Sequence, residues 1–77
     1  MASKPYNGHE SWTAWNVALW IGNDEPLYRL AMECIQTTKS VHRAANMFAA
    51  RSGLARTPDG AKYSHHNVEL ALSGLKE

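Results

Sequence analysis

The sequence predicts a small all-α domain of about four short helices, with a turn-rich insert before the last one. Three observations support this fold class. Between residues 24 and 36, apolar residues recur at the spacing of an amphipathic helix. A good helix-capping residue precedes each expected helix, namely Ser11, Asp24, Ser40 and Ser64. A run of turn residues precedes only the last helix, and a 77-residue chain has room for one core, so residues 1–77 form a single domain.

The first half of the chain predicts an irregular arm and two helices. Residues 1–10 contain Asn-Gly and proline and are expected to form the arm. A first helix should begin after Ser11 and end at Gly22. Asp24 can cap a second helix, whose first turn accommodates Pro26 without losing a hydrogen bond. The apolar stripe of this second helix consists of Leu27, Leu30, Ala31, Cys34 and Ile35.

The second half predicts two more helices around a turn. Ser40 should cap a helix that ends at Gly53, with an inner stripe formed by Val41, Ala44, Ala45 and Phe48. Ser64 should cap the last helix, which buries Val68, Ala71, Leu72 and Leu75. Between them, Thr57-Pro58-Asp59-Gly60 has the residue order of a type I turn, and residues 54–63 have room for a small hairpin.

Composition indicates a globular cytoplasmic protein. The chain is 44% hydrophobic and 19% charged, unlike the polar profile of disordered proteins. Its single cysteine forms no internal disulfide, which fits a reducing compartment. No apolar run follows the N-terminus, and the longest one, residues 17–21, is too short for a bilayer, so we expect neither a signal peptide nor membrane contact.

Three tryptophans within nine residues are the most unusual local feature. At about 100° per residue, Trp12, Trp15 and Leu19 share one side of the first helix and are expected in the core. Ala14, Val17 and Ile21 form a second apolar side, so we expect this helix to be covered on two sides. Trp20 falls in the polar sector instead. Either the chain's own arm or C-terminal segment covers Trp20, or it is a partly exposed aromatic that anchors an interface.

The net charge of +1 conceals an asymmetry along the chain. Residues 1–35 carry two basic and four acidic side chains, whereas residues 36–66 carry five basic side chains and one acidic. Three of the four histidines also lie in this basic stretch. A basic surface suits nucleic acid, an acidic protein face or simple solvation, and the sequence leaves all three open.

Two strings resemble a family of small proteins of bacteriophages and other mobile elements. The first is Tyr6-Asn7-Gly8 followed by Ser11-Trp12-x-x-Trp15-Asn16-Val17-Ala18-Leu19-Trp20-Ile21 and Asn23-Asp24-Glu25-x-Leu27-Tyr28, and the second is Thr57-Pro58-Asp59-Gly60-x-Lys62-Tyr63. Residues 36–56 do not match. The resemblance implies no particular activity. It implies a phage protein in the bacterial host cytoplasm, and many small phage proteins, anti-CRISPR proteins among them, bind a host machine and block it.

The chemistry-bearing residues predict no enzyme, no cofactor and no metal. Cys34 lies on an apolar helix face and should be a buried, inert thiol. His65 and His66 are adjacent, so on a helix they point about 100° apart and do not grip one ion. A metal site would require His9, His42 or Cys34 to converge from distant positions.

The basic stretch also permits a DNA-binding interpretation. Two helices around a turn, the second opening with His65, His66 and Asn67, resemble a helix-turn-helix. Two features oppose this: residues 54–63 exceed the usual three- or four-residue turn, and the net charge is far below that of a typical nucleic-acid binder.

The leading hypothesis is a steric inhibitor of a host protein or ribonucleoprotein complex, such as a CRISPR effector. The chain is not acidic enough to mimic DNA by charge. The expected contact residues are aromatic, basic or imidazole side chains: Trp20, Arg43, Arg51, Arg56, Lys62, Tyr63, His65 and His66. The alternative is a small DNA-binding regulator, and a third possibility is a subunit that dimerises through the tryptophan-rich helix.

Overall fold

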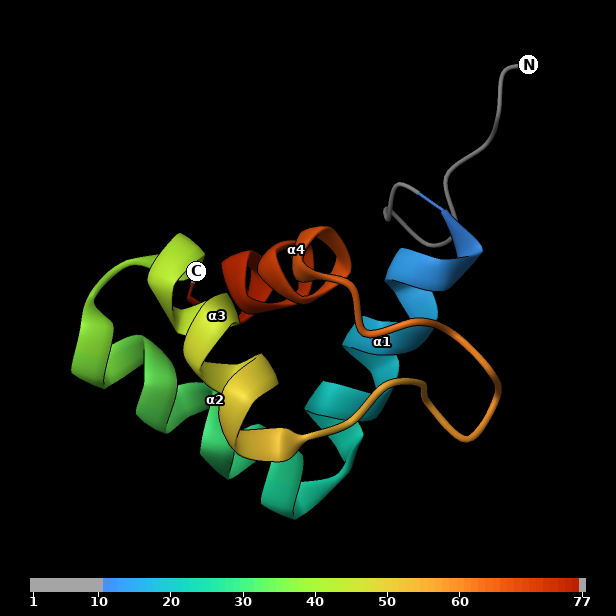
Figure 1. Ribbon diagram of the computed structural model, residues 1–77, viewed down its shortest axis with the longest axis horizontal. Coiled ribbons are helices and arrows are strands. Elements are labelled where there is room, and N and C mark those ends of the chain that lie inside the picture. Colours follow the sequence, from blue (N-terminus) through green and yellow to red (C-terminus); the bar gives the residue numbers. More distant parts are fainter. Residues whose placement is uncertain (1–10, 77) are drawn as a thin grey trace.

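Four helices follow one another along residues 11–76, the part of the chain that the computed structural model describes (Figure 1). They are α1 (Trp12–Asn23), α2 (Glu25–Thr38), α3 (Val41–Ser52) and α4 (His65–Lys76). This confirms the expected all-α fold, with one long connection placed before the last helix. The expected arm, residues 1–10, lies outside the described residues.

The predicted serine caps are present. Each serine hydroxyl accepts a hydrogen bond from the backbone N–H three residues ahead, at 3.2 Å for Ser11, 3.4 Å for Ser40 and 3.2 Å for Ser64. These bonds satisfy N–H groups that have no partner within the helix. Asp24 occupies the cap position of α2, but its side chain makes no capping hydrogen bond. The first helix also runs one residue beyond Gly22, to Asn23.

The core lies where the four helices meet. α4 packs against both α1 and α3, and α2 closes the group by packing against α1 and α3. Many core residues are small, which lets the helices approach closely. The buried cluster comprises Val17, Ile21, Ala31, Cys34, Ile35, Ala44, Ala45, Phe48, Ala61, Tyr63, Val68, Ala71 and Leu72. Cys34 is fully buried, as the sequence predicted.

The prediction that α1 is covered on two sides was correct for the side with Ala14, Val17 and Ile21 and wrong for the side with the tryptophans. Trp12 and Leu19 are 38% and 37% exposed, and Trp15 is only half-buried. The buried residues of α1 are Ala14, Asn16, Val17 and Ile21. The smaller apolar face carries the contacts because the other helices and the loop before α4 approach α1 from that side.

No helix in residues 11–76 combines the length and the apolar character needed to cross a bilayer. The connection between α3 and α4 runs over the surface alongside α1 (Figure 1). This connection forms part of the candidate site.

Candidate functional site

Residues 54–63 fold back on themselves as a minimal hairpin. The backbone N–H of Gly60 donates to the carbonyl of Thr57 at 2.8 Å, which closes the predicted turn. Gly60 has φ +97°, a conformation that glycine adopts without strain. Arg56 and Lys62 form an isolated antiparallel bridge on either side of the turn. We call residues 54–63 the hairpin loop.

A polar network attaches the hairpin loop to α1. Asp59 Oδ2 accepts hydrogen bonds from Asn16 Nδ2 at 2.9 Å and from Trp20 Nε1 at 3.0 Å. Thr57 Oγ1 donates to Asn16 Oδ1 at 2.6 Å and accepts from the backbone N–H of Ala61 at 3.0 Å. The bond from Asn16, and then that from Trp20, hold the pKa of the Asp59 carboxyl below its ordinary value, because both bonds favour the charged form. The network therefore fixes the hairpin loop against the helix.

The position of Trp20 matches neither of the two expected alternatives in full. Its indole is half-buried, and its N–H is bonded to Asp59 of the hairpin loop. Within the described residues, this contact comes from the turn and not from the C-terminal segment. The remaining surface of the ring faces a cleft.

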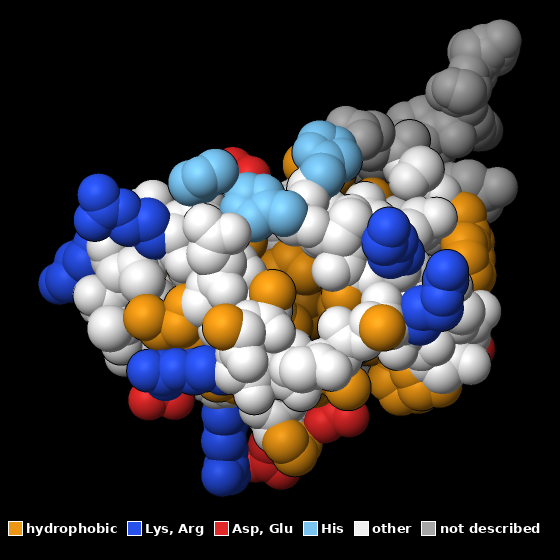
Figure 2. Space-filling view, viewed as in Figure 1, with side chains coloured by type: hydrophobic (Ala, Val, Ile, Leu, Met, Phe, Trp, Pro, Cys, Tyr) orange, Lys and Arg blue, Asp and Glu red, His pale blue; other side chains and the backbone are white. Residues whose placement is uncertain are grey.

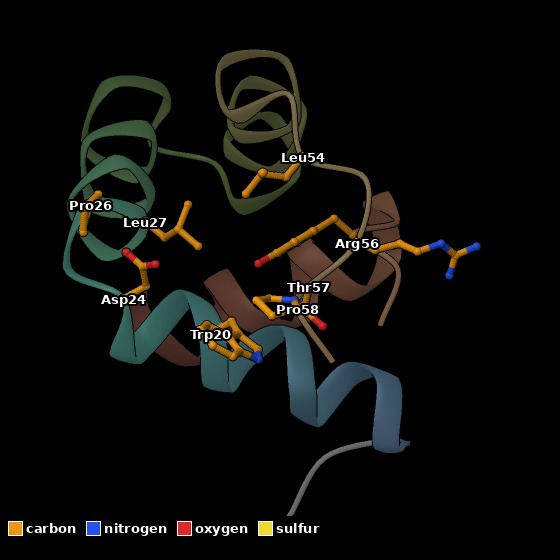
Figure 3. Close-up of a pocket in the computed structure, with 9 residues that line it drawn as sticks. Trp20, Asp24, Pro26, Leu27, Leu54, Arg56, Thr57 and Pro58 are labelled. Carbon is orange, nitrogen blue, oxygen red and sulfur yellow. The ribbon is translucent and has the colours of Figure 1, made fainter. Parts of the chain in front are cut away.

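The cleft lies between α1, the start of α2 and the hairpin loop (Figure 3). Its volume is about 470 Å³. Most of the lining side chains are apolar or aromatic. The complete lining comprises Trp20, Asp24, Pro26, Leu27, Leu54, Arg56, Thr57, Pro58 and Tyr63. Figure 3 shows the side chains of Leu27 and Leu54 pointing toward each other from opposite walls, with Trp20 and Pro58 at the lower side.

The charges of the cleft sit at its edges. The guanidinium of Arg56 points away from the cavity (Figure 3), and its Nη1 donates to the carbonyl of Gly60 at 3.2 Å. Asp24 lies on the opposite side, at the corner between α1 and α2. Burial, followed by the negative charge of Asp24, raises the pKa of Tyr63, so its phenol stays neutral. The interior is thus an uncharged aromatic and aliphatic surface.

Three of the eight predicted contact residues line this cleft: Trp20, Arg56 and Tyr63. Tyr63 does so as a largely buried wall residue, only 8% exposed. Lys62 is exposed beside them in the hairpin loop.

The other predicted contact residues lie on α3 and α4, away from the cleft. Arg43 is exposed, and Arg51 Nη1 lies 3.3 Å from Glu33 Oε2 in a partly exposed ion pair. His65 and His66 belong to the first turn of α4. Figure 2 shows the Lys and Arg side chains in separate groups and not as one continuous patch. The structure therefore divides the predicted surface in two.

Sequence reasoning missed the aliphatic half of the cleft. Leu54 is 41% exposed, and an isolated leucine in a basic, turn-rich stretch was the available signal for it. Leu27 was assigned to the helix core, which is correct in part because it packs against the core while lining the cleft. Pro58 was recognised only as a turn residue.

The helix-turn-helix interpretation gains little support from this geometry. Residues 53–64 separate α3 from α4, far more than a three- or four-residue turn. The side-chain amide of Asn67 donates to the carbonyl of Lys62 at 3.1 Å. His65 contacts the carbonyl of His42 and lies near Glu69. The expected base-reading side chains of His65 and Asn67 are thus engaged within the protein.

The comparison with known protein families decides the membership of this chain. Residues 2–75 match a family described as a family of unknown function (DUF7249). The chain belongs to this family. No curated protein and no solved structure matches it. The match spans α1, the hairpin loop and nearly all of α4, so the cleft lies entirely within the part of the chain that defines a DUF7249 protein.

Proposed function

We propose that this protein acts by binding, and that the cleft receives an apolar segment of a partner protein. The observation that carries the proposal is the lining itself: Trp20 and Tyr63 form its aromatic surface, and the guanidinium of Arg56 lies at its edge. Tryptophan, tyrosine and arginine are the residue types that dominate the binding energy of protein interfaces. The cleft adds aliphatic walls from Leu27 and Leu54, which favour an apolar side chain of the partner.

The edges of the cleft indicate the chemistry of the flanking residues of that partner. Arg56 and Lys62 are both exposed on the hairpin-loop side. A partner carboxylate next to the inserted apolar side chain would pair with these two cations at the exposed rim, so no charge would be buried inside the cleft. We therefore infer an acidic and apolar segment of a protein, and not a nucleic-acid backbone, as the occupant.

The resemblance to small phage proteins directs this proposal to a bacterial host complex. Bound to such a complex, an 8.6-kDa domain blocks a surface by occupying it, with no chemical step. A CRISPR effector is the specific target we propose. The test is phage plating on cells that carry an active CRISPR effector: we expect the wild-type protein to restore plaques, and unchanged immunity would reject this target.

Two leucines of nearly equal exposure provide a matched test of the cleft. Leu54, in the cleft, is 41% exposed, and Leu19, on α1 outside the cleft lining, is 37% exposed. We expect Leu54→Glu to abolish binding to the immobilised, purified effector complex in biolayer interferometry, because a carboxylate replaces an apolar wall. Leu19→Glu should bind like the wild type. Equal binding by both variants, or loss only in Leu19→Glu, would place the interface elsewhere.

Binding to nucleic acid is the competing outcome. A gel shift with duplex DNA that weakens steeply between low and physiological salt would favour the small regulator instead. In that case Arg43→Glu on α3 should abolish the shift while Leu54→Glu leaves it intact, the reverse of the pattern expected for the cleft.

A further inference from the structure

A second group of functional side chains lies where α3 and α4 begin, and it does not belong to the cleft. His42 comes from the first turn of α3, while His65 and Glu69 lie one turn apart on α4. The two imidazole rings meet edge to face with centroids 4.7 Å apart. Figure 2 shows the described histidines gathered along one edge of the molecule. The two histidines are 23 positions apart in the sequence, so nothing local indicated their proximity.

The donor atoms of this group have the spacing of a metal site. Glu69 Oε1 lies 3.7 Å from His42 Nδ1 and 3.5 Å from His65 Nδ1. In a tetrahedral zinc site with bonds of about 2.0–2.1 Å, neighbouring ligand atoms lie roughly 3.3–3.4 Å apart. One ligand atom from each of the three residues lies within 4.8 Å of the others. All three side chains are solvent-accessible, so rotation of these side chains is the movement by which the remaining gap would close.

The contact of the second ring nitrogen of His65 also suits a metal ligand. Its Nε2 lies 3.3 Å from the backbone carbonyl of His42, and a carbonyl oxygen only accepts hydrogen bonds. The proton of a neutral His65 ring is therefore placed on Nε2, which leaves a lone pair on Nδ1. That lone pair faces the Glu69 carboxylate, another acceptor. Metal-binding histidines use this arrangement, in which the second ring nitrogen donates to a backbone carbonyl.

We propose that His42, His65 and Glu69 form a binding site for a divalent transition-metal ion of the zinc type. Two imidazoles and one carboxylate suit zinc, whereas magnesium and calcium prefer oxygen ligands alone. Three protein ligands leave a fourth position open to water or to a group from another molecule. A bound ion would join α3 to α4 and so stabilise the fold. This inference departs from the expectation of no metal and is independent of the cleft.

The test is isothermal titration of the full-length protein with zinc chloride. We expect one site per chain in the wild type. His42→Ala and Glu69→Gln should each weaken zinc binding at least about tenfold, the lower end of what even a supporting group contributes to a metal site. His66→Ala is the control, because His66 lies beside the group but is not one of its three members. Magnesium chloride should give no binding.

Circular dichroism of the His42→Ala and Glu69→Gln variants distinguishes loss of a metal ligand from loss of the fold. Both side chains are solvent-accessible, so the helicity should be unchanged. Cobalt provides a second readout, because a tetrahedral site with nitrogen ligands produces visible absorption bands that His42→Ala should remove. No zinc binding by the wild type, or equal affinity in the wild type and both ligand variants, would overturn the proposal.

Discussion

At the scale of single residues, Asp59 and Asn16 connect the two parts of the cleft. One carboxylate oxygen of Asp59 accepts bonds from Asn16 and Trp20, so a side chain on the turn aligns two side chains of α1. Asn16 is only 1% exposed. A buried amide is tolerated when its donor and acceptor are both satisfied, and here Asp59 accepts from its nitrogen while Thr57 donates to its oxygen.

Replacing the Asn16 amide by a carboxylate should destabilise the protein strongly. Asn16→Asp has almost the same shape, but it removes the donor to Asp59 and places a second negative charge at hydrogen-bond distance. We expect a loss of at least about 2 kcal/mol in the free energy of unfolding, measured by urea denaturation. Asn46→Asp, at an exposed position of α3, should stay within about 0.5 kcal/mol of the wild type. Similar losses in both variants would show that the network contributes little.

The Asp59 bonds also predict a pH dependence. The folded-state pKa of Asp59 is lowered by the bonds from Asn16 and Trp20, so the folded state favours the charged form. The resulting stabilisation is present at neutral pH and is lost as the pH falls below about 4, through the folded-state pKa. We expect the melting temperature of Asp59→Asn to fall less than that of the wild type when both are measured at decreasing pH. An identical acid profile in wild type and variant would contradict the assignment.

At the scale of the helices, the sequence predicted those features that depend only on residues close together in the chain. Serine caps, the end of α3 at Gly53 and the stripe of α2 follow from local hydrogen bonding and helical spacing. The buried face of α1 does not. Both Val17 and Trp15 lie on apolar sides of that helix, and only the positions of the other helices decide which side is covered. The prediction covered both apolar sides of α1, but the close approach of the other helices buried only the side with the smaller side chains.

The C-terminal caps of α2 and α3 offer a paired test. Lys39 caps the C-terminus of α2 with φ +59°, and Gly53 caps that of α3 with φ +65°, so the same left-handed conformation is held by a lysine and by a glycine. We expect Lys39→Gly to stabilise the protein by about 0.5 kcal/mol, because relief of the left-handed strain exceeds the added chain entropy. Gly53→Ala should cost about 1 kcal/mol. The measurement is urea denaturation, and opposite signs at the two sites are the expected result.

At the scale of the whole molecule, the cleft arises from segments about 40 residues apart. The tryptophan-rich string and the Thr-Pro-Asp-Gly string were both conspicuous in the sequence, but nothing local indicated that they touch. Hydrogen bonds of Asn16 and Trp20 to Thr57 and Asp59 span 39 to 43 residues. The individual residues Trp20, Arg56 and Tyr63 were therefore predicted as contacts, whereas the cleft they share required the tertiary structure. The histidine group at the start of α3 and α4 escaped prediction for the same reason.

The core and the cleft are coupled through Phe48, which is fully buried on α3. Its ring lies 6.4 Å from that of Tyr63, between centroids, so the aromatic wall of the cleft rests on the core. A domain of this length has a total stability of about 4–12 kcal/mol. Removing a buried phenylalanine side chain costs about 3–5 kcal/mol. One substitution therefore removes much of the stability of the whole molecule.

Phe48→Ala should lower the melting temperature by at least about 12 °C, since each kcal/mol corresponds to roughly 4–8 °C in a domain of this size. Leu54→Ala is the control: it also removes a large apolar side chain, but from an exposed position, and the melting temperature should change little. Partner binding, measured well below both melting temperatures, should be weakened more by Leu54→Ala than by Phe48→Ala. There Leu54→Ala loses a direct contact, while Phe48→Ala weakens binding only through the position of Tyr63. If Phe48→Ala melted like the wild type, the helices would be held together elsewhere than in this core.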